Sequence, residues 1–333
     1  MTVGEPADPT PASSPSGAPG STIFSLDRPG AGLYAAAWFF AFASIALLGI
    51  GILADSPTAR AVLVLGGFLA LVACFGAAGG YQVIARAGRP PGAYRGPSPL
   101  IAFGLAVGLS SVLAVVLDVV PILALTSAPG FLLALAFVLV GYLLTITLLV
   151  VRTGALAWPD LLRLAAQPRR RVIDFVAGAV SGLVVVLPLA VLGGLLASAV
   201  GVSASAGDRL PDLSTAPSAM VVALGVVLVA PLGEELFFRG FAQSAWWADL
   251  GAGRALRRSA VFFAFVHVFN ATGVTFRDAA GGALVQFVVI LPLAFLLGLL
   301  YERRGLAGSL GAHMAYNAGV LGLALVAGGA LHP

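Results

Sequence analysis

The stretch GFLLALAFVLVGYLLTITLLVV, residues 130–151, decides the fold class because it contains no charged side chain. A run of 18 or more apolar residues is long enough to cross a bilayer as an α-helix. Comparable runs recur along the whole chain of 333 residues. A transmembrane β-barrel would show alternating segments of about ten residues instead, and none are visible. We therefore predict an all-α fold, a polytopic membrane helical bundle.

The composition supports a membrane protein. Hydrophobic residues make up 59% of the chain and charged residues only 10%, whereas a soluble domain carries about 25% charged residues. The net charge of +4 raises the possibility of nucleic-acid binding, but the arginines are scattered among short loops, as orientation in a membrane requires. We expect the lipid bilayer as a partner and no nucleic acid. The single cysteine, Cys74, excludes an internal disulfide and a cysteine-based zinc site.

Nine apolar segments set the expected topology, or eight spans if the short seventh segment is not a full span. They are 31–53, 61–85, 99–126, 130–151, 174–200, 217–238, 258–270, 281–301 and 306–330. Arginine-rich loops follow the second, fourth, sixth and eighth segments, and the loops between them carry few arginines. The positive-inside rule then places the N-terminus in the cytoplasm and the C-terminus outside, in a multi-pass protein of the cell membrane.

Three further stretches have expected roles. Residues 1–27 are rich in Pro, Ser, Gly and Ala and lack the regions of a signal peptide, so we expect a disordered cytoplasmic tail. Residues 28–200 should form N-terminal transmembrane helices of unassigned role. Residues 153–171 fit either a short interfacial helix, with Trp158 and leucines toward lipid, or an ordinary cytoplasmic loop.

Ionisable residues inside membrane segments are costly and usually face a protein interior or water. Those in this chain are Asp118, Glu234, Glu235, Arg239, His267 and His313, with Asn317 as a polar neighbour. Each of the two histidines lies nine residues beyond an arginine at the expected cytoplasmic end, or ~13 Å along a helix. The glutamate pair closes the sixth segment on the same side. Three helices should therefore bring these groups together in the cytoplasmic half of the bilayer, whereas Asp118 stands apart and we expect it to be structural.

The spacing of these residues places them in pairs on helix faces. Three pairs stand four residues apart, namely Glu235 with Arg239, Phe263 with His267, and His313 with Asn317. Arg239 can neutralise or hold Glu235, which leaves Glu234 pointing about 100° away around the helix and available as a base. Asn317 can either orient His313 or donate a hydrogen bond to an oxyanion. Phe263 should pack beside the site.

Three short motifs carry a family resemblance. EELFFR (234–239) matches Glu-Glu-x-x-x-Arg, FAFVH (263–267) matches Phe-x-x-x-His, and HMAYN (313–317) matches His-x-x-x-Asn. In this order and in hydrophobic segments, they resemble the CPBP family of intramembrane metalloproteases, which includes the CAAX prenyl endopeptidases and bacterial bacteriocin-processing and self-immunity proteins. The resemblance covers roughly residues 217–325. It implies a protease core at 217–330 that cleaves a membrane-associated protein or peptide substrate.

The resemblance also implies roles for the site residues. The implied catalytic residues are Glu234 to activate water, Glu235 and Arg239 to support it, His267 and His313 as further essential groups, and Asn317 to stabilise the oxyanion. Two mechanisms stay open. Glu234, His267 and His313 permit one zinc ion with an open position for water, and they equally permit a metal-free glutamate and histidine pair that activates water. We favour the metal-free mechanism slightly.

Two other functions compete with proteolysis. A catalytically silent member of the same fold would act as a membrane scaffold or a self-immunity or regulatory protein. A proton-coupled transporter would also use intramembrane Glu, His and Arg, but it should have pseudo-symmetric halves, and the polar groups here are confined to the last four segments. The sequence identifies neither the substrate, nor its prenylation, nor the oligomeric state.

Overall fold

The computed structural model describes residues 28–119, 127–202, 210–211, 213–271, 273 and 275–327. Within these residues the chain is all α-helical and contains no strand, which confirms the predicted fold class. Seven helices in this part of the chain are long and apolar enough to cross a membrane. The tail at 1–27 and the side chain of Asp118 lie outside the described residues, so their expected roles stay predictions.

The long helices follow the predicted segments. They are α1 (Ala31–Leu53), α2 (Pro57–Arg86), α3 (Pro99–Val119), α4 (Ala128–Ile146) with the π-helical turn η1 (Thr147–Val151), α6 (Pro168–Val200) and α11 (Phe276–Ala327). The sixth span is one continuous rod made of α7 (Ala216–Ala223), η3 (Leu224–Val229), α8 (Ala230–Glu234), η4 (Glu235–Gln243) and α9 (Ser244–Leu250). Two shorter helices are α5 (Trp158–Leu162) and α10 (Ala252–Val268).

The difference between nine predicted segments and seven candidate spans has two causes. First, α11 contains a non-helical residue, Gly305, with φ 63° and ψ −166°, which divides its 52 residues into two arms. A straight helix of that length would extend ~78 Å, more than twice the thickness of a hydrocarbon core. The two arms correspond to the predicted eighth and ninth segments. Second, the predicted seventh segment is α10, whose 17 residues make a short helix.

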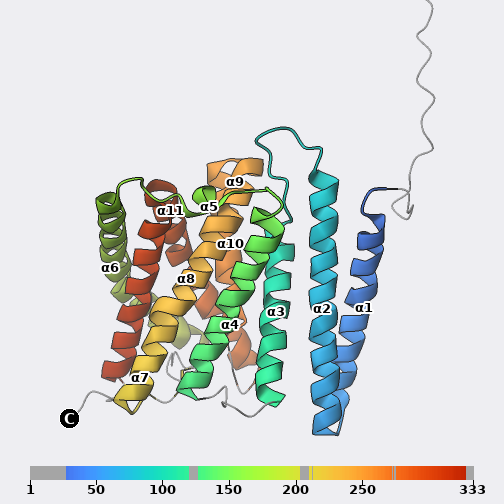
Figure 1. The fold of residues 1–333 in the computed structure, drawn as a ribbon. Coiled ribbons are helices and arrows are strands. Elements are labelled where there is room, and N and C mark those ends of the chain that lie inside the picture. The colour runs from blue at the N-terminus through green and yellow to red at the C-terminus, as the bar shows by residue number, and fades with distance from the viewer. Residues whose placement is uncertain are drawn as a thin grey trace, which may run out of the picture.

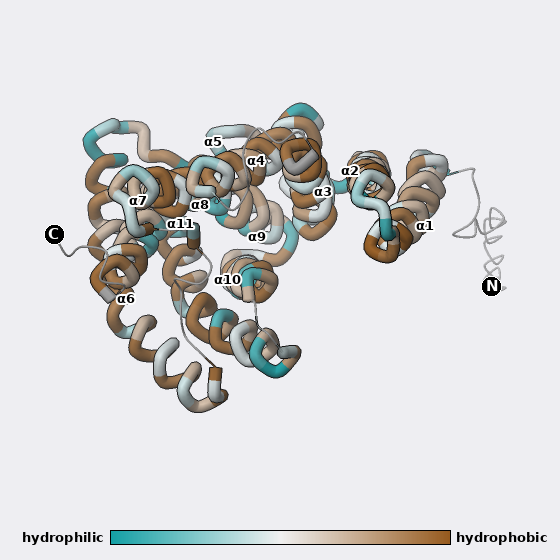
Figure 2. The backbone as a smooth tube through the Cα atoms, turned by 90° about the horizontal axis from the view of Figure 1, so that it is seen from below, coloured by the Kyte–Doolittle hydropathy of each residue, from teal (hydrophilic) through white to brown (hydrophobic). Residues whose placement is uncertain are grey.

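The arginine-rich loops gather at one end of the bundle. The α2–α3 loop, α5 and α9 lie at the upper end in Figure 1, and α7 and the α1–α2 turn lie at the lower end. Seen along the bundle in Figure 2, α1 and α2 stand to one side of the group formed by the other helices. Large apolar side chains such as Phe39, Phe42 and Ile45 are 66–70% exposed on α1. Together with the apolar helices, this surface is that of a multi-pass membrane protein.

Small residues let α6 approach the second arm of α11. A Cβ atom on Gly178 would collide with the carbonyl oxygen of Gly308, and one on Gly182 would collide with that of Ala312. Such close backbone approach needs glycine, because any side chain would push the helices apart. Since Ala312 precedes His313 in the chain, this contact fixes the depth and the rotation of that histidine.

The loop at 153–171 does contain a short helix, α5, whose apolar side chains Trp158 and Leu161 pack against the protein. Leu161 is 1% exposed, and Trp158 packs against the main core cluster. The hydroxyl of Tyr301 donates a hydrogen bond to the carbonyl oxygen of Leu161 at 2.8 Å. The carbonyl of Arg163 occupies the space that a side chain on Gly305 would need. The loop therefore fits against the bend of α11.

A pair of glycine variants tests the α6–α11 contact. Gly182→Ala places a methyl group against the carbonyl of Ala312, and we expect a loss of about 1–3 kcal/mol in stability. Gly194→Ala is the matched control on the same helix, because no atom lies within 4 Å of its added Cβ. The thermal midpoint in one detergent should fall for the first variant only. Equal midpoints for both variants would contradict the packing.

Candidate active site

Three helices bring the predicted site residues together. Glu234 ends α8, Glu235 begins η4, His267 lies near the end of α10, and His313 lies on the second arm of α11. The Oε2 atom of Glu234 is 3.8 Å from Nε2 of His267 and 3.6 Å from Nε2 of His313. The convergence expected from the sequence is thus present in the structure.

The two adjacent glutamates have different surroundings. Consecutive residues of a helix point about 100° apart, and here the side chain of Glu234 is 22% exposed while that of Glu235 is 0% exposed. The π-helical turns of η4 begin at this point, and such turns occur frequently at functional sites. Only Glu234 of the pair can therefore meet water or a substrate.

Glu235 lies in a buried network of polar side chains. Its Oε1 atom is 3.0 Å from Nη1 of Arg239 and accepts a hydrogen bond from Nδ1 of His313 at 2.8 Å. The Arg239 guanidinium is also fully buried and stands 4.0 Å from the ring centroid of Phe263. A buried charge without a partner is costly, so each member of this network holds the next in place.

The hydrogen bonds of the histidines indicate which ring nitrogen carries hydrogen. Nδ1 of His267 lies 2.8 Å from the carbonyl oxygen of Phe263, which can only accept, so Nδ1 is the donor. Nδ1 of His313 likewise donates to the Glu235 carboxylate. In the neutral rings both Nε2 atoms therefore carry lone pairs, and both of these atoms lie within 4 Å of Glu234.

Phe263 and Asn317 complete the motifs. The Phe263 ring packs beside both histidine rings, with centroid distances of 4.3 Å to His267 and 5.7 Å to His313, so its expected packing place is observed. Asn317 donates through Nδ2 to the carbonyl of Val226 in η3 at 2.8 Å. His313 is oriented by Glu235 and not by Asn317, so of the two expected tasks for Asn317 the oxyanion contact stays a prediction.

The three candidate metal ligands have suitable chemistry but wide spacing. Ligating histidines usually donate their second ring N–H to a carbonyl or a carboxylate, as both histidines do here. Nitrogen and oxygen ligands at 2.0–2.2 Å from a tetrahedral zinc ion stand ~3.4 Å apart, somewhat less than the 3.6 Å and 3.8 Å distances to Glu234. As placed, no three His, Cys, Asp or Glu groups in the described part of the chain are arranged to hold a metal. A small closure of Glu234 onto the two rings would be needed.

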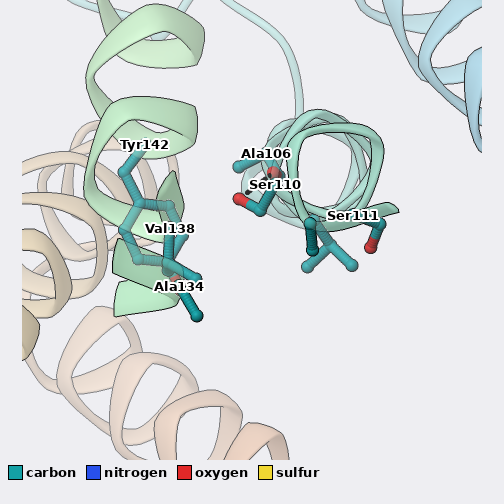
Figure 3. Close-up of a pocket in the computed structure, with 8 residues that line it drawn as sticks. Ala106, Ser110, Ser111, Ala134, Val138 and Tyr142 are labelled. Atoms are coloured by element: carbon teal, nitrogen blue, oxygen red, sulfur yellow. Dashed lines mark hydrogen bonds between the residues drawn. The ribbon is translucent and has the colours of Figure 1, made fainter. Parts of the chain in front are cut away.

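A cavity lies between α3 and α4 (Figure 3). Its volume is about 250 Å³, and it is lined by Ala106, Val107, Ser110, Ser111, Ala114, Ala134, Val138 and Tyr142. The Tyr142 ring stacks on Phe237 with centroids 4.6 Å apart and lies against Gly233, the residue before Glu234. Tyr142 therefore stands between this cavity and the glutamate pair. The sequence gives no signal for this role, because Tyr142 lies in an apolar run far from the motifs.

Two conservative variants separate the roles of the glutamates in stability. Glu235→Gln leaves the buried Arg239 charge without its partner, and breaking such a pair costs about 3–5 kcal/mol. Glu234→Gln changes a partly exposed carboxylate and should cost less than about 1 kcal/mol. Thermal unfolding of both variants in the same detergent provides the comparison. Equal losses of stability in the two variants would mean that the Glu235–Arg239 ion pair contributes no more to stability than Glu234 does.

The site residues lie within a part of the chain that matches a known protein family. Residues 216–319 match the family model described as type II CAAX prenyl endopeptidase Rce1-like, and all three motifs fall inside these bounds. No curated protein and no solved structure matches the chain. The CPBP resemblance of the motifs is therefore confirmed over residues 216–319, where the chain matches the Rce1-like family of CAAX prenyl endopeptidases.

Proposed function

We propose that this chain is an intramembrane endopeptidase that hydrolyses a peptide bond of a membrane-associated protein or peptide. The family match supports a CAAX-type membrane protease. One observation carries the proposal further: the partly exposed carboxylate of Glu234 lies within 4 Å of the Nε2 atoms of two histidines. The site therefore combines a base, Glu234, with two further proton acceptors, the Nε2 atoms of His267 and His313. The exposed side of Glu234 leaves a position for water beside them.

Glu234 acts as the general base in this proposal. It takes a proton from a water molecule as the water oxygen forms a bond to the carbonyl carbon of the substrate. The resulting tetrahedral carbon carries an oxyanion, and Glu234 returns the proton to the amide nitrogen as the C–N bond breaks. The products are a new carboxylic acid and a new amine, and a proton passes from the acid to the amine to give a carboxylate and an ammonium group, so atoms and charges balance.

The remaining residues position the water and balance charge. One hydrogen of the water points to Glu234, and the lone pair on Nε2 of His267 or His313 accepts a hydrogen bond from the other. If His313 takes up a proton, Glu235 stabilises the resulting imidazolium, because it already accepts from Nδ1. Arg239 balances the charge of Glu235. Asn317 uses one amide hydrogen for Val226, and its second is the candidate donor to the oxyanion.

A zinc ion held by Glu234, His267 and His313 would supply an activated water and a polarised carbonyl. We propose the metal-free route for this chain because the three donors, as placed, stand wider apart than zinc ligands do. We further propose that the protein resides in the cell membrane with its N-terminus in the cytoplasm, so that the site lies in the cytoplasmic half of the bilayer.

Single substitutions at the site test proteolysis. Glu234→Ala, His267→Ala and His313→Ala should each lower cleavage of a membrane-anchored peptide at least about 100-fold, since each removes a proton-transfer or water-binding group. Asp55→Asn, at an exposed position in the α1–α2 turn, is the control and should leave the rate unchanged. Product formation is followed by mass spectrometry in proteoliposomes with a panel of prenylated and unprenylated peptides.

Each outcome of that assay is informative. Full activity in any of the three variants would remove that residue from the site. A folded wild-type protein that cleaves no peptide of the panel would favour the scaffold or self-immunity function over proteolysis.

Metal removal tests the route of water activation. After exhaustive chelation and removal of the chelator, cleavage should persist at close to the untreated rate, because the base and the proton acceptors belong to the chain. Metal content is determined on the same sample. Loss of activity that zinc restores, together with bound zinc that His267→Ala and His313→Ala abolish, would establish the metal-dependent route instead.

A further inference from the structure

A second pocket, lined mainly by charged residues, lies at the arginine-rich end of the bundle, where α5, α6 and the bend of α11 meet. Its volume is about 260 Å³, and its lining residues are Arg163, Ala165, Arg170, Asp174, Glu302, Arg303, Arg304 and Gly305. None of these residues belongs to the candidate active site. We propose that this arginine pocket binds a phosphate group.

The charge of the arginine pocket favours an anion. Four guanidinium groups and two carboxylates line it, which leaves an excess of two positive charges. Asp174 is almost fully buried and lies between Arg170 at 3.2 Å and Arg304 at 2.9 Å. The Asp174 carboxylate holds Arg170 and Arg304 at the wall of the pocket. Its single negative charge balances only one of these two arginines, so one positive charge remains.

Of the other two arginines, Arg163 is held by aromatic rings. The guanidinium of Arg163 stacks over the ring of Trp247 at 4.6 Å and that of Tyr301 at 5.4 Å. Arg303 is exposed at the rim. Glu302 accepts a hydrogen bond from the buried Gln243 at 3.2 Å, so its carboxylate is partly engaged by the protein. Because the protein holds three of the four arginines, the pocket loses less side-chain entropy when it binds a ligand.

The chemistry and the position of the pocket both suit phosphate. The planar guanidinium group matches phosphate oxygens in a two-pronged hydrogen bond. Arg163 and Ala165, which follow α5, line the pocket, and α5 lies at the end of the bundle where the arginine-rich loops gather (Figure 1). There, phospholipid headgroups would surround the helix ends, and anionic lipids attract basic residues. Orientation in the membrane explains arginines in these loops, but it does not require a buried aspartate to fix two of them around one pocket.

Thermal unfolding of the whole chain of 333 residues in detergent tests this proposal and distinguishes two sources of phosphate. The ligands are dioctanoyl phosphatidylglycerol, dioctanoyl phosphatidylcholine and inorganic phosphate, each titrated against the thermal midpoint. A ligand that binds only the folded protein raises the midpoint as its concentration exceeds its dissociation constant. A rise with phosphatidylglycerol alone identifies a lipid headgroup, and a rise with inorganic phosphate as well shows that the free ion suffices.

Matched variants tie the binding to this pocket. Arg303→Gln should weaken binding about fivefold or more, while Arg257→Gln removes an exposed arginine of α10 outside the pocket and should leave it unchanged. Glu302→Gln removes a negative charge from the wall and keeps an oxygen to accept from Gln243, so binding should tighten about fivefold. Because this last variant predicts a gain, misfolding cannot mimic it.

Three results would overturn the proposal. They are the absence of any midpoint shift with the three ligands, equal weakening by Arg303→Gln and Arg257→Gln, and unchanged affinity in Glu302→Gln. None of these measurements uses peptide cleavage, so the proposal stands or falls independently of the proposed protease activity.

Discussion

The ion pair between Glu235 and Arg239 is the constraint on which the site depends. Both side chains are fully buried in the interior of a membrane protein, where an unpaired charge is among the most expensive groups to accommodate. The pair spans one turn of η4 and fixes how this turn is rotated. That rotation leaves Glu234 partly exposed, close to the two histidines.

The same pair connects the three helices of the site. Glu235 accepts from His313 on α11, and Arg239 lies over the ring of Phe263 on α10. His267 lies one turn beyond Phe263 and donates a hydrogen bond to its carbonyl oxygen through Nδ1. A rotation of any one helix would break a contact to a buried charge, so these contacts set the geometry around Glu234.

Much of this arrangement follows from the sequence, and the rest depends on tertiary contacts. Helical spacing places Glu235 and Arg239 on one face, and the distances from flanking arginines place His267 and His313 at a similar depth. The bond between Glu235 and His313 joins residues 78 apart in the chain. It depends on the bend at Gly305, which the hydropathy pattern showed only as a break between two segments. The contact between Tyr142 and Gly233 could not be predicted from the sequence, because the pattern of apolar residues does not indicate which membrane helices are neighbours.

The most direct test of the central claim is cleavage of a membrane-anchored peptide in ¹⁸O-labelled water by wild type and Glu234→Gln in parallel. Hydrolysis by a water molecule that Glu234 activates predicts one ¹⁸O atom in the new carboxylate of the wild-type product and intact peptide with the variant. Labelled product formed at the same rate by both proteins would contradict the account, because water would then attack without Glu234.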